Sequence, residues 1–306
     1  MLVPSWNGGI DVTLEEKSTQ LNKTQAELLL AAVIIARSGS FLLSKVVLRS
    51  MTPLNLLSVR FVMAFVLLAT VFWKRIFFAG WSAVWRGLLL GGIFIATMAA
   101  ELMGLRTSDS SRIAFLENSA FVFVPLYQAL LERRWPGLRS VVCVLATLAG
   151  IACLTLRGGP AGFSSGDLFG VLAAMLYALA IIVTDRFARR HDPLTLGLIQ
   201  VGGMALFATI AAFCFGSPRL PSGGAEWGLI AGLAVVCSGF GFTLQPVAQR
   251  GTTAERAGFF CALAPVSAAI LGCLFLHEHF GLQSLIGAAL VMTGILIPHF
   301  WKQNPA

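Results

Sequence analysis

Ten long apolar runs fill most of this chain of 306 residues. Each run is about 20 residues long, the length that a helix needs to cross the ~30 Å hydrocarbon layer of a bilayer. The runs do not alternate polar and apolar residues as the strands of a membrane barrel do. The sequence therefore predicts an all-α membrane protein with transmembrane helices at about 27–44, 54–73, 85–104, 113–131, 138–156, 167–184, 194–215, 227–246, 257–276 and 280–298.

The composition agrees with burial in lipid. Only 12% of the residues are charged and 57% are hydrophobic, whereas a soluble domain carries about 25% charged residues. The six cysteines lie inside apolar runs without a C-x-x-C pair, and the four histidines do not cluster with them, so we expect no metal and no cofactor. The sequence contains no Walker A or H-E-x-x-H motif, so we expect that the chain is not an enzyme.

The basic residues predict the orientation. If the N-terminus is cytoplasmic, 14 of the 22 Lys and Arg residues flank the inner helix ends, 6 flank the outer ends, and Arg37 and Arg60 remain inside spans. This bias favours a multi-pass protein of the plasma (inner) membrane with both tails, 1–25 and 299–306, in the cytoplasm. The net charge of +8 is then a topology signal that suits anionic lipid heads, and we expect no nucleic-acid partner.

Two parts of the chain resemble one another. Segment 107–156 begins with Thr-Ser and segment 252–298 begins with Thr-Thr. In each, an Arg precedes an apolar span, a short loop with an acidic residue follows, and a second apolar span ends the segment. We therefore expect two five-helix repeats, at 26–157 and 166–298. Because five is odd, the repeats must cross the membrane in opposite directions, as the inverted repeats of secondary transporters do.

Several short motifs in this order and spacing resemble the EamA-type branch of the drug/metabolite transporter superfamily. They are Ser38-Gly39-Ser40-Phe41 with Lys45, Pro53-Leu54 with Arg60-Phe61, Gly104-Leu105 with Thr107-Ser108 and Ala114-Phe115-Leu116, Leu131-Glu132-Arg133, Gly166-Asp167-Leu168 with Tyr177, and Glu278. The resemblance implies ten helices and alternating access to a small polar solute. The sequence departs from the family pattern at Arg37, Glu117 and Phe121, where a Trp, an apolar residue and a Pro are usual.

Four ionisable residues stand out in the predicted spans because they lie several residues from the span ends: Arg37, Arg60, Glu101 and Glu117. A charge at the bilayer centre costs about 2.5–3.5 kcal/mol on insertion scales, so such residues usually face a cavity or a partner. Arg37 and Glu117 would bind solute or pair with each other. Arg60 would form a structural pair with another residue or extend its side chain toward the membrane interface. Glu101 would bind solute or, as the alternative, have an interfacial or structural role.

Helical spacing adds aromatic and polar neighbours to these charges. The predicted solute-binding residues are Arg37, Ser40, Phe41, Glu101, Glu117, Phe121, Tyr177, Phe242 and Gln245, and the predicted structural or gating residues are Arg60 and Pro265. Such mixed faces are typical of small-molecule pockets, although each stripe alone would also suit helix packing.

The presence of both Arg37 and Glu117 favours a zwitterionic solute such as an amino acid, whose export the resemblance suggests. Without an ATP-binding motif, active transport would draw on solute exchange or on a coupling proton or ion. The alternatives are an organic-cation or drug carrier of the same fold, a membrane-embedded enzyme, for which 277–279 (His-Glu-His) is the one hint, and a channel. The solute, the direction, the coupling ion and the oligomeric state stay open.

Overall fold

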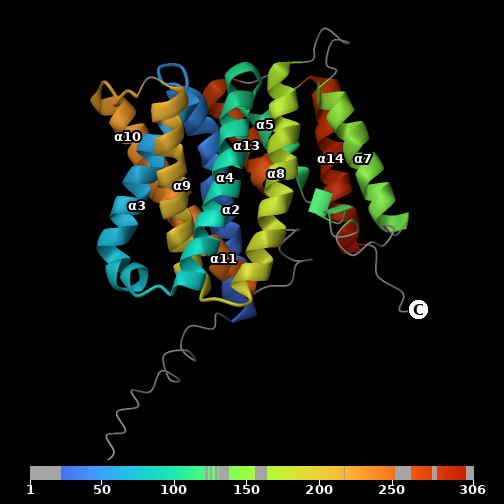
Figure 1. Cartoon of the computed structure of the whole chain (residues 1–306). Coiled ribbons are helices and arrows are strands. Elements are labelled where there is room, and N and C mark those ends of the chain that lie inside the picture. The colour runs from blue at the N-terminus through green and yellow to red at the C-terminus, as the bar shows by residue number, and fades with distance from the viewer. Residues whose placement is uncertain are drawn as a thin grey trace, which may run out of the picture.

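The computed structural model describes residues 22–120, 123–124, 126–127, 130, 138–155, 164–216, 218–251, 263–277 and 281–300, and every regular element among them is a helix (Figure 1). The predicted all-helical fold is therefore confirmed. The helices are α2 (Lys23–Val47), α3 (Pro53–Phe77), α4 (Trp81–Thr107), α5 (Ser110–Asn118), α7 (Leu138–Thr155), α8 (Ser165–Ala188), α9 (Pro193–Phe215), α10 (Gly224–Gly232), the π-helix η2 (Leu233–Phe240), α11 (Gly241–Arg250), α13 (Leu263–Leu276) and α14 (Leu282–Phe300).

Within the described ranges, six helices are long and apolar enough to cross a membrane, and shorter apolar helices accompany them. The six are Thr24–Val47, Pro53–Phe77, Trp81–Thr107, Ser165–Ala188, Pro193–Phe215 and Gly224–Arg250. Large apolar side chains such as Val71, Phe213 and Leu274 are exposed, whereas Arg60, Glu101 and Glu117 are buried. This apolar exterior around a polar interior suits a lipid surrounding.

The first and the last helix of the described part of the chain meet the same end of the bundle. In Figure 1, α2 starts and α14 finishes at the lower end. The first helix of the second half, α8, starts at the upper end and runs downward, opposite to α2 (Figure 1).

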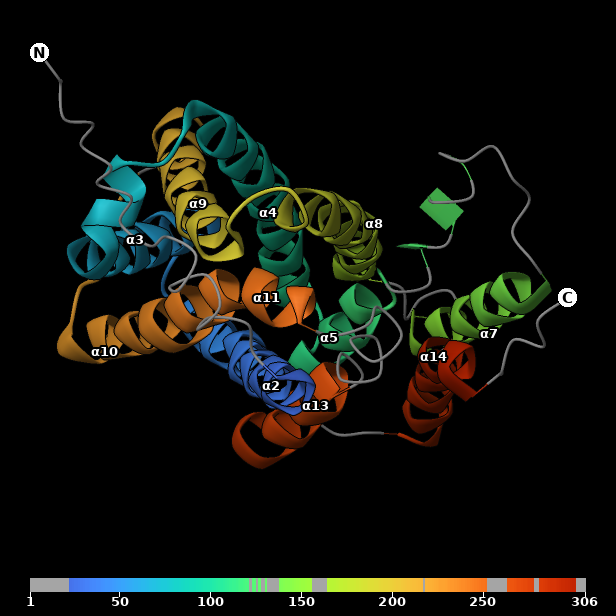
Figure 2. The same ribbon diagram turned by 90° about the horizontal axis from the view of Figure 1, so that it is seen from below.

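The helix contacts repeat between the halves. Helix α4 packs on α8 as α11 packs on α2, and α5 packs on α8 as α13 packs on α2. The pairs α3–α9, α5–α13 and α7–α14 each join equivalent helices. Both views show the α7–α14 pair at one side of the bundle (Figures 1 and 2).

The eighth span departs from a regular α-helix. It is one continuous run in which the π-helix Leu233–Phe240 separates α10 from α11, and such segments are frequent at functional sites. The sequence did not predict it. Pro265 was predicted to have a structural or gating role in the ninth span, but the residues before Leu263, including the one four positions before this proline, lie outside the described residues. The gating role of Pro265 therefore stays a prediction.

A buried ion pair joins the two halves at the upper end. Asp167, which is fully buried, accepts a hydrogen bond from Arg112 Nη2 at 2.7 Å and from Ser108 Oγ at 3.0 Å. Its carboxylate also accepts from the backbone nitrogen of Ser164 at 2.9 Å, which closes a capping box at the start of α8. One side chain thus ties the end of α4 and the start of α5 to α8.

Replacing Asp167 with Ala should destabilise the bundle strongly. Removing one partner of a buried ion pair leaves an uncompensated charge, at a cost of about 3–5 kcal/mol. The matched control is Asp185→Ala, because Asp185 pairs with Arg189 one turn away on an exposed surface, where such pairs contribute little. Thermal unfolding in detergent measures both, and equal midpoints for the two variants would contradict this account of the junction.

Close helix approach depends on Gly91 in α4. A Cβ atom there would lie 2.8 Å from the Gln200 carbonyl oxygen and 2.9 Å from the Gly203 backbone, both in α9. Backbone atoms cannot move aside as a flexible side chain does, so α4 and α9 would have to separate.

Gly91→Ala should therefore lower the unfolding temperature, because overpacking costs about 1–3 kcal/mol. The neighbouring Gly92→Ala is the control, since its Cβ atom would meet only the Phe207 ring, at an ordinary 3.5 Å. Both changes alter the intrinsic helix propensity equally, so unfolding midpoints that fall together would show that the α4–α9 contact is not the cause.

Candidate functional site

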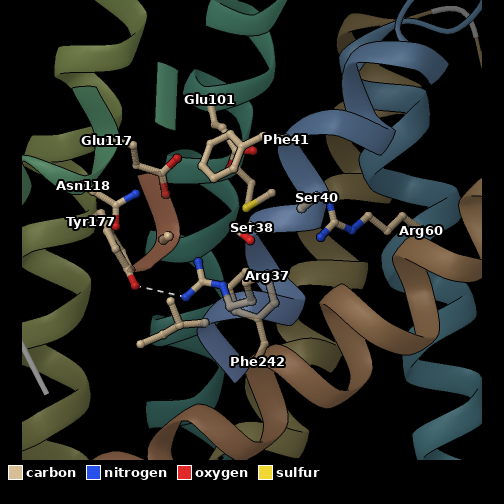
Figure 3. Close-up of a pocket in the computed structure, with 13 residues that line it drawn as sticks. Arg37, Ser38, Ser40, Phe41, Arg60, Glu101, Glu117, Asn118, Tyr177 and Phe242 are labelled. Carbon is tan, nitrogen blue, oxygen red and sulfur yellow. Dashed lines mark hydrogen bonds between the residues drawn. The ribbon is translucent and has the colours of Figure 1, made fainter. Parts of the chain in front are cut away.

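A cavity lined by charged, polar and apolar side chains lies between helices of both halves (Figure 3). Its lining comes from α2, α3, α4, α5, α8, α11 and α13: Ile34, Arg37, Ser38, Ser40, Phe41, Arg60, Met98, Glu101, Glu117, Asn118, Tyr177, Phe242 and Ala264. The space open to the centres of water molecules is about 30 Å³. This is room for one or a few waters, so the cavity is small in this conformation.

Arg37 lies in the cavity and is held on one side. Its Nη1 donates to Tyr177 Oη at 3.0 Å and to Gln245 Oε1 at 2.6 Å. Its guanidinium lies over the Phe242 ring at 4.4 Å and the Tyr177 ring at 5.3 Å. Gly241 makes room for it, because a Cβ atom there would lie 2.7 Å from Arg37 Cγ.

No carboxylate among the described residues lies within ion-pair distance of Arg37. The described residues therefore do not form the Arg37–Glu117 ion pair that was the alternative to solute binding. Both of its hydrogen bonds use Nη1, and no described residue accepts from Nη2 or Nε. These N–H groups form one edge of the guanidinium fork, the edge that a carboxylate can accept from in bidentate fashion.

Arg60 is buried at 1% exposure, so it does not reach the interface. Its Nε donates to Ser238 Oγ at 2.5 Å and its Nη1 donates to Ser40 Oγ at 2.9 Å. Ser238 belongs to the π-helix, so Arg60 connects α2, α3 and η2. Its burial and its bonds to two other helices fit a structural role.

Glu101 and Glu117 enter the cavity from α4 and α5 (Figure 3). Both are buried at 2% exposure, line the same cavity and interact electrostatically with each other. Glu101 Oε1 and Glu117 Oε2 accept no hydrogen bond from an N–H or hydroxyl group in the described part of the chain. Glu101 therefore belongs to the buried site and not to the interface.

Aromatic rings form one wall of the cavity. Phe94 packs edge-to-face on Tyr177 and on Phe242, with ring centroids 6.1 and 5.4 Å apart, and Phe242 packs in the same way on Phe61 at 5.8 Å. These contacts fix the rings that flank Arg37.

The structure brings most of the predicted site residues together. The same cavity is lined by eight of them: Arg37, Ser40, Phe41, Arg60, Glu101, Glu117, Tyr177 and Phe242. Gln245 is not part of the lining but accepts a hydrogen bond from Arg37. Phe121 lies outside the described residues, and Pro265 is not part of the lining.

Sequence reasoning missed other residues of the site. Met98, Ile34 and Ala264 carry no charge or hydrogen-bonding group that would mark them in an apolar run. Phe94 was missed for the same reason, because it is one of 23 phenylalanines. Asn118 had a usable signal, since it is polar and follows Glu117 directly.

Comparisons with known proteins agree with this architecture. The model of the EamA-like transporter family matches residues 24–156 and again 164–298. An uncharacterized transporter of Archaeoglobus fulgidus is 24% identical over 90% of this chain and 97% of its own length. The uncharacterized transporter YvbV of Bacillus subtilis is 24% identical over 91% of this chain and 92% of its own length.

A solved crystal structure shares the fold, with a TM-score of 0.65, 18% identity, and coverage of 90% of this chain and 96% of that one. The two matches to the family model together span nearly the whole sequence and coincide with the two halves of the bundle. The chain is thus a multi-pass membrane transporter and not an enzyme, and it belongs to the EamA-like transporter family.

Proposed function

We propose that this transporter carries a small zwitterion, such as an amino acid with an apolar or aromatic side chain, through the central cavity. The observation that carries the proposal is the free edge of Arg37, whose guanidinium faces the cavity without an ion pair among the described residues. A charge-assisted bidentate bond to a solute carboxylate would satisfy that edge.

The rest of the cavity suits the other groups of such a solute. The carboxyl groups of Glu101 and Glu117 offer acceptors for an ammonium group. The rings of Phe242 and Tyr177 offer an apolar wall beside Arg37. Opposite charges at two ends of one cavity select a molecule that carries both charges.

Alternating access is supported by the arrangement of the two halves. Helices α2 and α8 run in opposite directions (Figure 1), and the helix contacts of one half recur in the other. Inverted halves around a midplane site can open alternately to the two sides by rocking against each other. The small cavity must widen before a solute larger than a few waters can bind, so this conformation suits a closed intermediate between the two open states.

The orientation and direction are part of the proposal. The end of α3 and the start of α4 lie at the lower end in Figure 1, and these two helix ends hold Lys74, Arg75 and Arg86. Such basic residues favour a cytoplasmic location for that end. Both termini would then lie in the cytoplasm of a cell bounded by this membrane, and solute would leave the cell in exchange for a second solute or a proton.

The second candidate function is transport of an organic cation. The observation that favours it is the buried pair of carboxyl groups beside aromatic rings, a common arrangement for cation recognition. The two candidates differ in what they require of Arg37, because a solute without a carboxylate gains nothing from a guanidinium.

Arg37→Ala should weaken transport of amino acids about 10- to 100-fold, the loss expected when a hydrogen bond to a charged group worth ~1.5–3 kcal/mol disappears. The measurement is counterflow of radiolabelled amino acids into proteoliposomes preloaded with the unlabelled compound. Arg106→Ala is the matched control, because Arg106 is an exposed arginine in the last turn of α4, outside the cavity.

Unchanged amino-acid counterflow in the Arg37→Ala variant would refute the proposed carboxylate contact. Faster uptake of quaternary amines by that variant, with no amino-acid counterflow by the unmodified protein, would instead support the organic-cation function. Thermal unfolding of each variant shows whether a loss of transport reflects a loss of folding.

A further inference from the structure

Two acidic side chains face the same small cavity. Glu101 and Glu117 come from different helices, line this cavity together and are both buried. Each also keeps one buried carboxyl oxygen that no N–H or hydroxyl donor in the described part of the chain reaches. Recognition of a solute ammonium alone would need one carboxylate, whereas this cavity holds two.

Two carboxylates that face one small cavity repel strongly when water is excluded, so such pairs usually hold one proton between them. A carboxylic acid O–H supplies the donor that the pair otherwise lacks. A shared proton therefore removes the repulsion between the carboxylates and supplies a missing hydrogen bond at once.

The charged and titratable neighbours of the pair come from several helices. Arg37 of α2 interacts electrostatically with both carboxyl groups, and Arg60 of α3 interacts electrostatically with Glu101. Tyr177 of α8 lines the same cavity, and Cys237 of η2 lies near Arg60. The described part of α13 contributes no Asp, Glu, His, Lys or Arg to it.

The charge count then depends on the proton. With one shared proton, the two arginines and the carboxyl pair sum to +1. If a zwitterion binds and the proton leaves, the pair carries two negative charges and the site, solute included, sums to zero. Binding of the zwitterion with loss of the proton thus leaves the buried site without net charge. Surroundings of low polarity favour a neutral site.

We propose that Glu101 and Glu117 form a proton-binding site that exchanges its one proton for the ammonium group of the solute. On loading, the O–H bond of the shared carboxylic acid breaks, the proton passes to water at the open side of the cavity, and both carboxylates accept hydrogen bonds from the ammonium. On release, a proton from water restores the pair. The exchange rests on the proposed function, whereas the shared proton itself does not.

Infrared spectroscopy of the purified protein tests the shared proton without any solute. The unmodified protein should show a buried carboxylic-acid C=O band that shifts in D₂O. The band should disappear in both Glu101→Gln and Glu117→Gln, because the remaining carboxyl then lies beside arginines without a like charge. Glu226→Gln, at a partly exposed residue that pairs with Arg219 outside the cavity, is the control and should keep the band.

Absence of the band in the unmodified protein, or its persistence in either single variant, would overturn the shared proton. Glu101→Asp and Glu117→Asp keep a carboxyl pair and should keep the band. They therefore answer the question if the Gln variants do not fold.

Proton release on binding tests the exchange. In weakly buffered detergent solution with a pH dye, L-phenylalanine should release close to one proton per molecule bound, and 3-phenylpropionate, which lacks the ammonium, should release none. Binding of L-phenylalanine without proton release would overturn the exchange. Failure of both compounds to bind would contradict the proposed function, and the infrared band would still decide whether the proton is shared.

Discussion

The structure depends on one constraint: a charge carried into a lipid-embedded bundle must find polar partners there. Arg37 and Arg60 meet it differently. Arg60 is enclosed by hydroxyl groups from two helices. Arg37 is anchored by Nη1 to Tyr177 and Gln245, and its other edge is left toward the cavity. Because lipid cannot solvate that edge, the helices around it must enclose a polar chamber.

The two halves supply complementary parts of that chamber. The first half contributes both arginines and both acidic residues, and the second contributes Tyr177, Phe242 and the π-helix with Ser238. Neither half alone surrounds Arg37. A movement of one half against the other would therefore change the surroundings of Arg37 directly, which links its charge to the conformation of the carrier.

Much of this architecture was predictable from the sequence, because hydrocarbon thickness and helical spacing leave few choices for apolar runs of this length. Arg37, Ser40, Glu101 and Glu117 were predicted for the site because polar groups are costly in such runs. Phe94 and Met98 were not, since an apolar residue in an apolar run gives no signal. The π-helix and the placement of Glu101 and Glu117 in one cavity also required the structure, because they depend on helix register and on how α4 meets α5.

The central claim is that the chamber around Arg37 is wet and opens to each side in turn. Ser38 lines the cavity, and its hydroxyl bonds its own helix at Ile35, so Ser38→Cys in a variant without other cysteines is a suitable probe. Membrane-impermeant thiol reagents should label it in both right-side-out and inside-out vesicles, more slowly with transported solute present. The lipid-facing control Val66→Cys should stay unlabelled. Labelling of Ser38→Cys from only one side, or from neither, would contradict the account.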